Sequence, residues 1–539
     1  MLALVLFIAG FWAYFHGAPP GTAFKAFNAD PELAYLVSSL AVFKGQPYVF
    51  VQHPGIPLTV LGTGLLALTY PFHWSSPDGF VAGSIRHPEV FILLTHAVLA
   101  LANVACVLLL GWKALSVRRW SDAVLAAAVP ASFFAFLPQS FFTTFYWSHN
   151  AVAFPFGTLL LLGSLVALRR GRPLPTRTAW ILGLGAGVLT ATQIYFATWA
   201  VGLASASATL ALLRPVHRRR AFGAALTALA GTALGFVACT AAMIPGYPRF
   251  LAWVHDLATH QGIYGQGPAG FISWKWYPAN LARLWDGAPA LFIASGVVFA
   301  MLLAAFVAQR RRWRRDAGLW AAAAGLSLQW AATLLLLAKH PSRFYLPAVA
   351  AMLPPLLAIA LAFWRRRGSG RLVCIAVAVI ILLGCVRTAA LSVAAHAKRI
   401  AYRTAMEEDV ERYLSGYAAA RGVGRQSVLV LWGPGVRDAG CYGLWMGDQY
   451  SDRALHREIS QACPSQGLAW SNTTVLPDGW SSREPVPGVL ITTEEAPRLF
   501  PAFAAFGEPE LSATRDPAGV RLAFYRVSVE EGRARAAVR

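Results

Sequence analysis

The chain has 539 residues, of which 57% are hydrophobic and only 13% are charged. Soluble globular proteins carry roughly 25% charged residues, so this composition excludes an ordinary soluble protein and places most of the chain in lipid. The formal net charge of +21 raises nucleic-acid binding as an alternative. Most cations, however, stand in short clusters between apolar stretches, as in the cytoplasmic loops of membrane proteins. We therefore expect membrane lipids, and no nucleic acid, among the partners.

The character of the chain changes near Ser392. Apolar stretches long enough to span a membrane recur from Met1 to about Ser392, and mixed sequence with frequent Gly and Pro follows. Residues 393–539 contain 17 Lys plus Arg and 17 Asp plus Glu, so the whole net charge belongs to residues 1–392. The sequence thus predicts a membrane domain over 1–392 and a small α/β domain over 393–539. Within the latter we expect a helix over 404–420 and strands over 427–432 and 488–492.

Five basic clusters, holding 20 of the 29 cations of residues 1–392, set the predicted topology. They lie at Lys113 to Arg119, Arg169 to Arg177, Arg214 to Arg220, Arg310 to Arg315 and Arg365 to Arg371. If all five are cytoplasmic, the chain crosses twice between successive clusters. About eleven transmembrane helices result, over 1–16, 89–112, 122–140, 150–168, 179–193, 196–213, 221–244, 287–309, 317–338, 343–364 and 372–392.

The number of crossings also determines on which side of the membrane the two ends of the chain and the first loop lie. The N-terminus is expected to be cytoplasmic and the α/β domain to be extracytoplasmic. The apolar stretch from Gly55 to Phe72 then cannot cross, and we interpret it as an interfacial or re-entrant helix. It belongs to one long external loop, residues 17–88.

Two of the eight carboxylates of residues 1–392 stand in Asp30-Pro31-Glu32, at the outer end of the first predicted span. A helix start explains this pattern, with Asp30 as N-cap and Pro31 in the first turn. The functional interpretation makes Asp30 a general base, because a carboxylate that is partly desolvated at the lipid boundary accepts a proton readily. Asp30 and Glu32 together also offer the paired oxygens that suit Mg²⁺ or Mn²⁺.

Further polar residues follow in the same loop. They are Tyr35, the run Lys44-Gly45-Gln46-Pro47-Tyr48 and the run Gln52-His53-Pro54-Gly55. An acidic pair, a Tyr, a Gly-containing turn and a His-Pro step before an amphipathic helix resemble the first external loop of the C superfamily of integral-membrane glycosyltransferases (GT-C). That group includes the protein O-mannosyltransferases and the lipid A aminoarabinose transferases.

A second resemblance lies at a late external junction, in the run from Lys339 through His340, Pro341, Ser342, Arg343, Phe344 and Tyr345 to Pro347. It is similar to the basic and aromatic elements, ending in Pro, that many members of the superfamily carry there. Arg343 and Lys339 would give a fork donor and a point charge to a lipid phosphate. The alternative is that both cations extend to lipid headgroups.

The resemblance implies a function. It implies the GT-C fold over 1–392, a polyprenyl-phosphate-linked sugar as donor and an inverting transfer to an envelope glycan, lipid or protein. Asp30 matches the catalytic acidic position. The candidate substrate-binding residues are Glu32, Tyr35, His53, His149, Asn150, His255, His260, Tyr264, Lys339, Arg343 and Tyr345.

The chain departs from the family pattern at two places. Many relatives carry an Asp in the next external loop, where this chain has Tyr146-Trp147-Ser148-His149-Asn150, and this weakens the case for a required metal. Relatives also often place a Lys where this chain has Gln193.

The long external loop over 245–286 contains His255, His260 and Tyr264 among several Trp and Tyr residues. Aromatic faces and imidazoles suit a carbohydrate site, but an aromatic belt at the membrane interface explains the Trp and Tyr equally well. In the α/β domain Cys441 and Cys463 can form a disulfide if the domain faces an oxidising compartment. Two unrelated buried thiols fit the spacing equally well.

Two alternatives of other classes remain. A transporter or flippase of lipid-linked sugars also needs many spans, but ionisable residues at mid-membrane and inverted repeats would be expected. A non-catalytic homologue would bind lipid-linked sugar without transferring it. The high Ala and Arg content indicates a GC-rich bacterial genome, and hence a bacterial inner membrane.

Overall fold

The computed structural model of the chain describes residues 29–48, 55–73, 76–115, 120–137, 146–152, 157, 172–261, 267–309, 316–339, 345–364, 370–433, 440–470, 473–478, 480, 486–495, 506, 508–515, 519–530 and 533–536. The chain separates into two compact units. The first comprises Met1–Phe11, Val51–Leu58 and His96–Ser392, and the second comprises Trp12–Phe50, Thr59–Thr95 and Val393–Arg539. The last division falls at Ser392, where the apolar stretches end. The second unit, however, also takes in most of the predicted external loop over 17–88.

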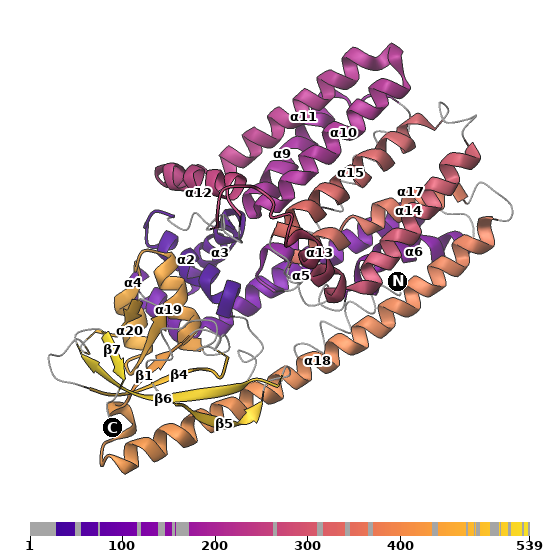
Figure 1. The fold of residues 1–539 in the computed structure, drawn as a ribbon. Coiled ribbons are helices and arrows are strands. Elements are labelled where there is room, and N and C mark those ends of the chain that lie inside the picture. Colours follow the sequence, from indigo (N-terminus) through magenta and orange to yellow (C-terminus); the bar gives the residue numbers. More distant parts are fainter. Residues whose placement is uncertain are drawn as a thin grey trace. The chain divides into compact units, whose positions relative to one another are not determined.

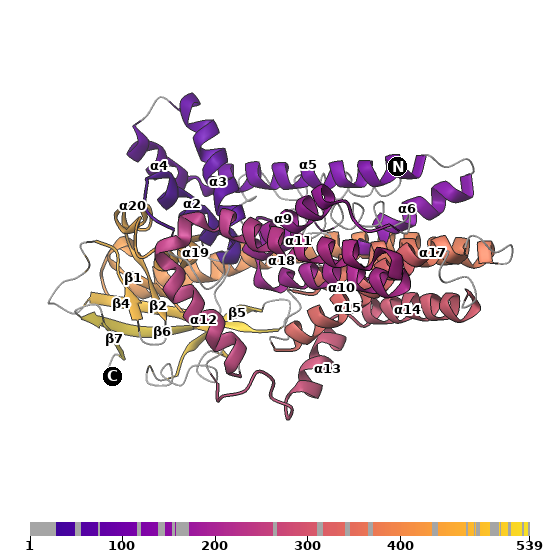
Figure 2. The same ribbon diagram turned by 90° about the horizontal axis from the view of Figure 1, so that it is seen from above.

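The first unit is helical (Figures 1 and 2). Its α-helices are most of α5 (Pro88–Leu115), α6 (Trp120–Ala135), α9 (Thr176–Thr192), α10 (Thr198–Leu213), α11 (Arg218–Cys239), α12 (Tyr247–Thr259), α13 (Tyr277–Gly287), α14 (Pro289–Gln309), α15 (Ala317–Lys339), α16 (Leu346–Ala350), α17 (Leu353–Trp364) and the first part of α18 (Gly370–Ala420). Short 3₁₀ turns, η4 (Ile194–Ala197), η5 (Pro215–His217) and η6 (Ala241–Gly246), connect some of them. A helix satisfies its own backbone hydrogen bonds, which is what a segment in lipid requires.

In the described part of the chain, seven helical segments are long and apolar enough to cross a membrane. They are Pro88–Cys106, Ile194–Leu213, Pro215–Cys239, Pro289–Ala308, Ala317–Lys339, Leu346–Trp364 and Gly370–Ala420, and each falls on a predicted span. Helices α6 and α9 fall on two further predicted spans but are shorter, with 16 and 17 residues. The remaining two predicted spans, 1–16 and most of 150–168, lie outside the described residues.

A close seam joins α9 and α11, which lie side by side in Figure 1. Gly183 and Gly187 of α9 lie against the backbone of Ala228 and Thr232 of α11. From the other side Gly231 and Gly235 of α11 lie against the backbone of α9. Small residues spaced four apart let two helix backbones approach each other in a membrane. This seam fixes the end of α9, and therefore the break in the chain that follows it.

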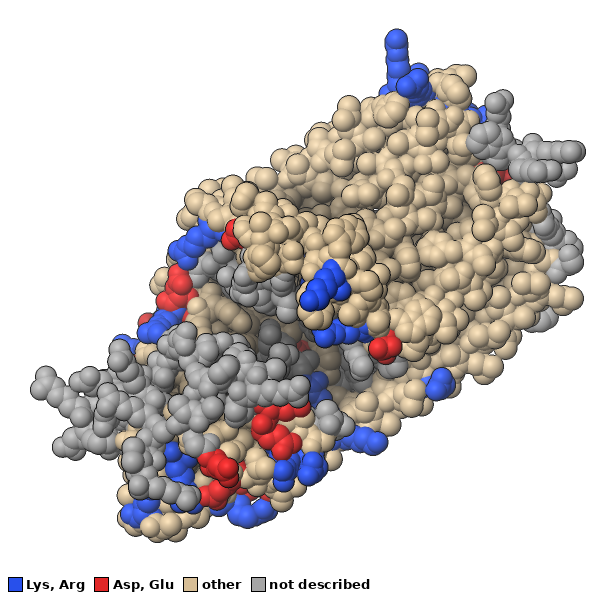
Figure 3. All heavy atoms as spheres, viewed as in Figure 1, with Lys and Arg blue, Asp and Glu red and all other residues tan. Residues whose placement is uncertain are grey.

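The charged residues of this unit lie away from its broad apolar face. Figure 3 shows the surface over α11, α15 and α14 without charged side chains. Arg218, Arg219 and Arg220, which belong to one of the predicted cytoplasmic clusters, are exposed at the start of α11. A broad surface without charged side chains is what we expect of a protein that spans a membrane.

The second unit contains a mixed β-sheet. Its strands are β1 (Leu429–Trp432), β2 (Gln466–Trp470), β3 (Thr473–Val475), β4 (Val486–Thr493), β5 (Glu510–Arg515), β6 (Arg521–Glu530) and β7 (Arg533–Ala536). The strand order is β3-β2-β1-β4-β6-β5, with β7 also paired to β6. β1 is parallel to β2 and β4, and the other pairs are antiparallel. The predicted strands over 427–432 and 488–492 are confirmed as β1 and β4.

Helices α19 (Gly440–Tyr450) and α20 (His456–Ala462) form the connection between β1 and β2. A parallel pair needs such a crossover. Cys441 at the start of α19 and Cys463 just after α20 form a disulfide. We call these two helices and the turn between them the α19–α20 hairpin.

The segment predicted as the first external loop contributes helices to this same unit. They are the turn η2 (Ala29–Leu33), α2 (Ala34–Phe43), most of α3 (Ile56–Thr69), η3 (Tyr70–Phe72) and α4 (Pro77–Arg86). α3 with η3 is followed by α4 at a bend of 114°, as in a broken span or a re-entrant loop. α2 packs on α19 and α4 packs on α20. The loop is therefore folded against the C-terminal sheet domain.

Candidate functional site

The Asp-Pro-Glu sequence forms one turn at the entrance to α2. Ala29–Leu33 is a single π-helical turn that continues directly into the helix. Pro31 has no N–H to donate, which suits the first turn of a helix. Because the turn begins at Ala29, Asp30 lies inside it and not at its N-cap. The side chain of Asp30 lies outside the described part of the structure.

Glu32 and Tyr35 point into the second unit. Both side chains are buried, Glu32 completely, and both interact with their surroundings. A buried carboxylate is stable only with such polar partners. The burial of Glu32 suits a role in fixing the turn more than a role in meeting an acceptor from solvent.

Hydrogen bonds fix α2 against α3 within this unit. The Ser39 hydroxyl donates to the Tyr35 carbonyl at 2.7 Å and lies 3.1 Å from the Thr59 carbonyl. The Thr63 hydroxyl donates to the Ser39 carbonyl at 3.2 Å. The helix that follows the candidate base is thus tied to the helix that the sequence identified as interfacial.

A second group of predicted site residues meets in the first unit. The rings of His149 and Tyr345 are stacked with centroids 5.7 Å apart, and Tyr195 packs on Tyr345 at 4.9 Å. Asn150, next to His149, is completely buried. We call His149, Asn150, Tyr195 and Tyr345 the aromatic cluster. Its members come from three junctions between helices, and the sequence predicts each junction at the outer ends of two spans.

The backbone around this cluster is interrupted at the places where its residues lie. α9 ends at Thr192, and Gln193 takes an extended conformation before the turn η4. The Thr192 carbonyl accepts from the Gly55 N–H at 3.1 Å, and the Trp147 indole donates to the Leu58 carbonyl at 3.2 Å. A fourth junction, the start of α3, is thereby held at the same end of the unit.

Two buried polar atoms in this region have no hydrogen-bond partner among the described residues, the Ser148 hydroxyl and the Gln193 amide nitrogen. Both atoms can hydrogen-bond to a polar ligand, although the Ser207 hydroxyl and the Gln329 amide nitrogen, which belong to no candidate site, likewise have no partner among the described residues. Gln193 is the position where members of the resembled superfamily often carry a Lys. Tyr195 was not predicted as a site residue from the sequence. The signal that could have identified it is its place as an aromatic residue in a short hairpin between two predicted spans.

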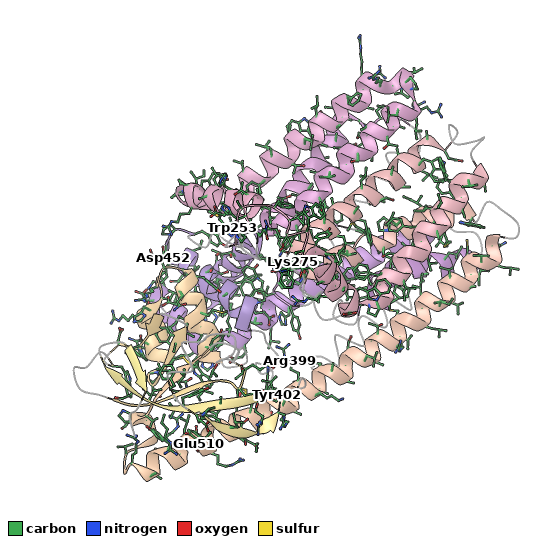
Figure 4. All side chains as sticks on the ribbon, viewed as in Figure 1. Trp253, Lys275, Arg399, Tyr402, Asp452 and Glu510 are labelled. Carbon is green, nitrogen blue, oxygen red and sulfur yellow. A yellow bond between two sulfur atoms is a disulfide. The ribbon has the colours of Figure 1, made fainter. Side chains whose placement is uncertain are left out.

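The segment over 245–286, which the sequence predicts to be an external loop, contains two amphipathic helices, α12 and α13. His255 on α12 is exposed, and the Nδ1 of His260, just beyond the helix, lies 2.9 Å from the Thr259 hydroxyl. Trp274 and Trp276 are exposed on either side of Lys275, which Figure 4 labels. Exposed tryptophans between two candidate spans fit an aromatic belt at a membrane interface.

Lys339 has a partner other than the one the sequence proposed. Its ammonium donates to the Leu257 carbonyl in α12 and lies over the Phe271 ring, 4.4 Å from the centroid. Both contacts join the end of α15 to the loop over 245–286. Lys339 therefore anchors this loop, and a phosphate contact by Lys339 stays a prediction.

Three other candidate residues, His53, Tyr264 and Arg343, lie outside the described residues. The Asp-Pro-Glu turn belongs to the second unit, and the aromatic cluster belongs to the first. The meeting of Asp30 and Arg343 at one phosphosugar stays a prediction.

The donor set for a metal is limited. In the parts of the chain that the structure describes, no group of three or more His, Cys, Asp or Glu side chains is placed to hold a metal ion. A Mg²⁺ or Mn²⁺ ion at Asp30 and Glu32 would thus draw its further oxygens from elsewhere, such as substrate phosphate and water. Comparison with known proteins found no matching family model and no matching curated protein.

Proposed function

We propose that this protein is an inverting membrane glycosyltransferase of the GT-C type. In this proposal the donor is a sugar linked to polyprenyl phosphate, and the acceptor is an envelope glycan, lipid or protein. The proposal rests on the resemblance of the two external sequence elements. What supports it in the structure is the aromatic cluster, in which His149, Tyr195 and Tyr345 come together from separate junctions.

The cluster has the chemistry that a sugar headgroup needs. Aromatic faces pack against sugar rings, and buried amides and hydroxyls bond to sugar hydroxyls. The Gln193 amide and the Ser148 hydroxyl supply such groups.

The topology that goes with this function has eleven spans. We propose that the N-terminus is cytoplasmic and that the C-terminal α/β domain lies outside the membrane, in the periplasm of a bacterial cell. The seven candidate spans support this arrangement. The Cys441–Cys463 disulfide supports it too, because disulfides persist in oxidising compartments.

In the proposed reaction Asp30 removes the proton of an acceptor hydroxyl as that oxygen attacks the anomeric carbon in line. The new glycosidic bond forms as the bond from the anomeric carbon to the phosphate oxygen breaks, with inversion. The polyprenyl phosphate leaves with the bonding electrons, and Arg343 and Lys339 stabilise its charge. A general base contributes about 10² to 10⁴ to the rate.

The test is transfer by purified protein from labelled polyprenyl-phosphate sugars to extracts of cell-envelope acceptors. We expect wild-type transfer, and a loss of about 10²-fold or more in Asp30→Asn with normal insertion and yield. Glu89→Gln is the matched control, because Glu89 is another carboxylate of residues 1–392 and its partner His87 is exposed. Near-normal transfer by Asp30→Asn would remove Asp30 from the mechanism. Movement of donor across a membrane without transfer would indicate a flippase, and binding alone a non-catalytic protein.

A further inference from the structure

Helix α2, which continues directly from the Asp-Pro-Glu turn, depends on its surroundings for stability. It has only ten residues, and every residue from Ala34 to Ala41 is buried. Isolated helices of this length are marginal in water, so packing must fix both its formation and its orientation. Its main neighbour beyond its own loop is α19 of the C-terminal region.

The contact between α2 and α19 is close at Gly447. A Cβ atom at this position would lie 2.9 Å from the Val37 Cβ and 3.1 Å from the Ala34 Cα. Real Cβ atoms essentially never show the first distance, and the second is tighter than nine in ten real Cβ contacts. Neither the Val37 Cβ nor the Ala34 Cα can rotate away, because both are fixed by the helix backbone. Only glycine allows α19 to contact the first turn of α2 at this distance.

Polar contacts continue this interface toward the end of α2. The Ser38 and Ser451 hydroxyls are 3.3 Å apart. Just beyond the helix, the Lys44 ammonium lies 2.6 Å from Glu458 of α20 and 3.1 Å from Asp78 of α4. The α19–α20 hairpin thus contacts α2 at its start, at its middle and beyond its end.

Of the two ion pairs that Lys44 makes, the pair with Glu458 is stronger than the pair with Asp78. The Lys44 and Glu458 side chains are 22% and 13% exposed, whereas Asp78 is 80% exposed. Fully exposed pairs contribute little because water screens them. The hydrogen bond to Glu458 is also the main cause that raises the pKa of Lys44 above its usual value.

The hairpin itself is held rigidly. The Asp448 carboxylate accepts from the Leu455 N–H at 2.9 Å across the turn, and the turn residues Asp452 and Arg453 both have positive φ, 51° and 63°. Figure 4 labels Asp452 in this turn. Non-glycine residues adopt this conformation only where the surrounding structure imposes it. The Cys441–Cys463 disulfide closes the hairpin at its base.

The hairpin is also tied to the sheet. The Trp445 indole of α19 donates to the Gln466 carbonyl at the start of β2 at 2.7 Å. The sheet therefore supports the hairpin, and the hairpin supports α2.

We propose that the α19–α20 hairpin positions the Asp-Pro-Glu turn, so that the C-terminal domain is part of the catalytic apparatus and does not merely cover it. Gly447, Ser451 and Glu458 are positioning residues that act through α2. This inference rests on the proposed function for its catalytic meaning. Its structural content, that the hairpin orders residues 29–44, is independent of the reaction.

The test measures order and transfer together in the intact, membrane-reconstituted protein. Hydrogen–deuterium exchange is followed in peptides that cover residues 29–44, and sugar transfer is followed in the same samples. Gly447→Leu separates α19 from α2, and we expect exchange of these peptides to rise at least tenfold and transfer to fall at least tenfold. Gly416→Leu is the matched control, because a Cβ at Gly416 meets nothing within 4 Å. It should change neither quantity.

If Gly447→Leu does not fold, swapping the two charges of the Lys44–Glu458 ion pair still tests the proposal. Lys44→Glu and Glu458→Lys should each raise exchange in residues 29–44, and the double variant Lys44→Glu/Glu458→Lys should restore protection and transfer. Wild-type exchange in Gly447→Leu or in both single variants would overturn the proposal. If exchange responds as expected but even the wild-type protein transfers no sugar, the positioning role stands and the transferase proposal fails.

Discussion

The glycine seam between α9 and α11 gives a prediction whose size follows from the structure. Gly235→Ala would place a Cβ 2.5 Å from the Leu184 carbonyl oxygen and 3.0 Å from the Leu184 Cα. Ordinary contact begins at 3.4 Å, so the helices must separate locally by about 3.4 − 2.5 = 0.9 Å. A gap of roughly 0.5–1 Å loses a quarter to a half of each dispersion contact along the seam. Overpacking of this kind typically costs about 1–3 kcal/mol.

The matched control lies on the same helix. A Cβ at Gly223 meets nothing within 4 Å, so Gly223→Ala keeps the gain in helix propensity without the clash. The difference between the two variants therefore isolates the cost of separating α9 from α11. We expect thermal unfolding of the intact protein in detergent to show Gly235→Ala several degrees below Gly223→Ala, since about 1 kcal/mol corresponds to roughly 2–4 °C in domains of 150–250 residues.

The same pair of variants tests the connection to the candidate site. α9 ends at the break in the chain where Gln193 lies. Because Gly235→Ala should move α9, we expect it to weaken sugar transfer. Gly223→Ala should not move α9, and we expect it to leave transfer unchanged. Equal melting temperatures for the two variants would refute the reasoning, because the clash would then have no cost.

Two further predictions concern single side chains. Burial raises the pKa of Asp448 from 3.8 to about 6, so the folded state binds more protons than the unfolded state between these values and loses roughly 3 kcal/mol of stability as pH rises through them. Melting curves of the intact protein should show this loss in the wild type and not in Asp448→Asn; parallel pH profiles would contradict it. Trp147→Phe removes the hydrogen bond to the Leu58 carbonyl and should cost about 1 kcal/mol, measured by thermal unfolding. An unchanged midpoint would show that the bond contributes nothing.

The membrane helices were largely predictable because hydropathy and the basic clusters act locally along the chain. Among the residues that the structure describes, all seven helical segments that are long and apolar enough to span fall on predicted spans. The end of the last span was not predictable in the same way. Apolar periodicity stops near Ser392, but α18 continues to Ala420 as one helix of 51 residues. The stretch after Ser392 is rich in Ala, Arg and Glu and contains no Pro, so nothing ends the helix before Gly422, whose φ is +66°.

The candidate site was predictable only in part. The sequence pointed to His149, Asn150 and Tyr345, and the structure brings His149 and Tyr345 together with Tyr195. The packing of α2 on α19 could not be foreseen, because Ser38 and Ser451 are 413 residues apart and neither lies in a recognisable motif. The hydrophobic periodicity of a helix shows which of its faces is apolar, but it does not show which other helix packs on that face.

The most direct test of the central claim is a cross-link between Asp30→Cys and Arg343→Cys in native membranes, in a background that lacks the four free cysteines Cys106, Cys239, Cys374 and Cys385. Ser38→Cys with Ser451→Cys is the positive control, because the two buried hydroxyls are 3.3 Å apart and thiols at these positions can join directly as a disulfide. We predict that mild oxidation joins the control pair, that a short bismaleimide joins the pair at 30 and 343, and that polyprenyl-phosphate sugar blocks only the bismaleimide reaction. A joined control pair beside an unjoined pair at 30 and 343 would contradict a shared phosphosugar site.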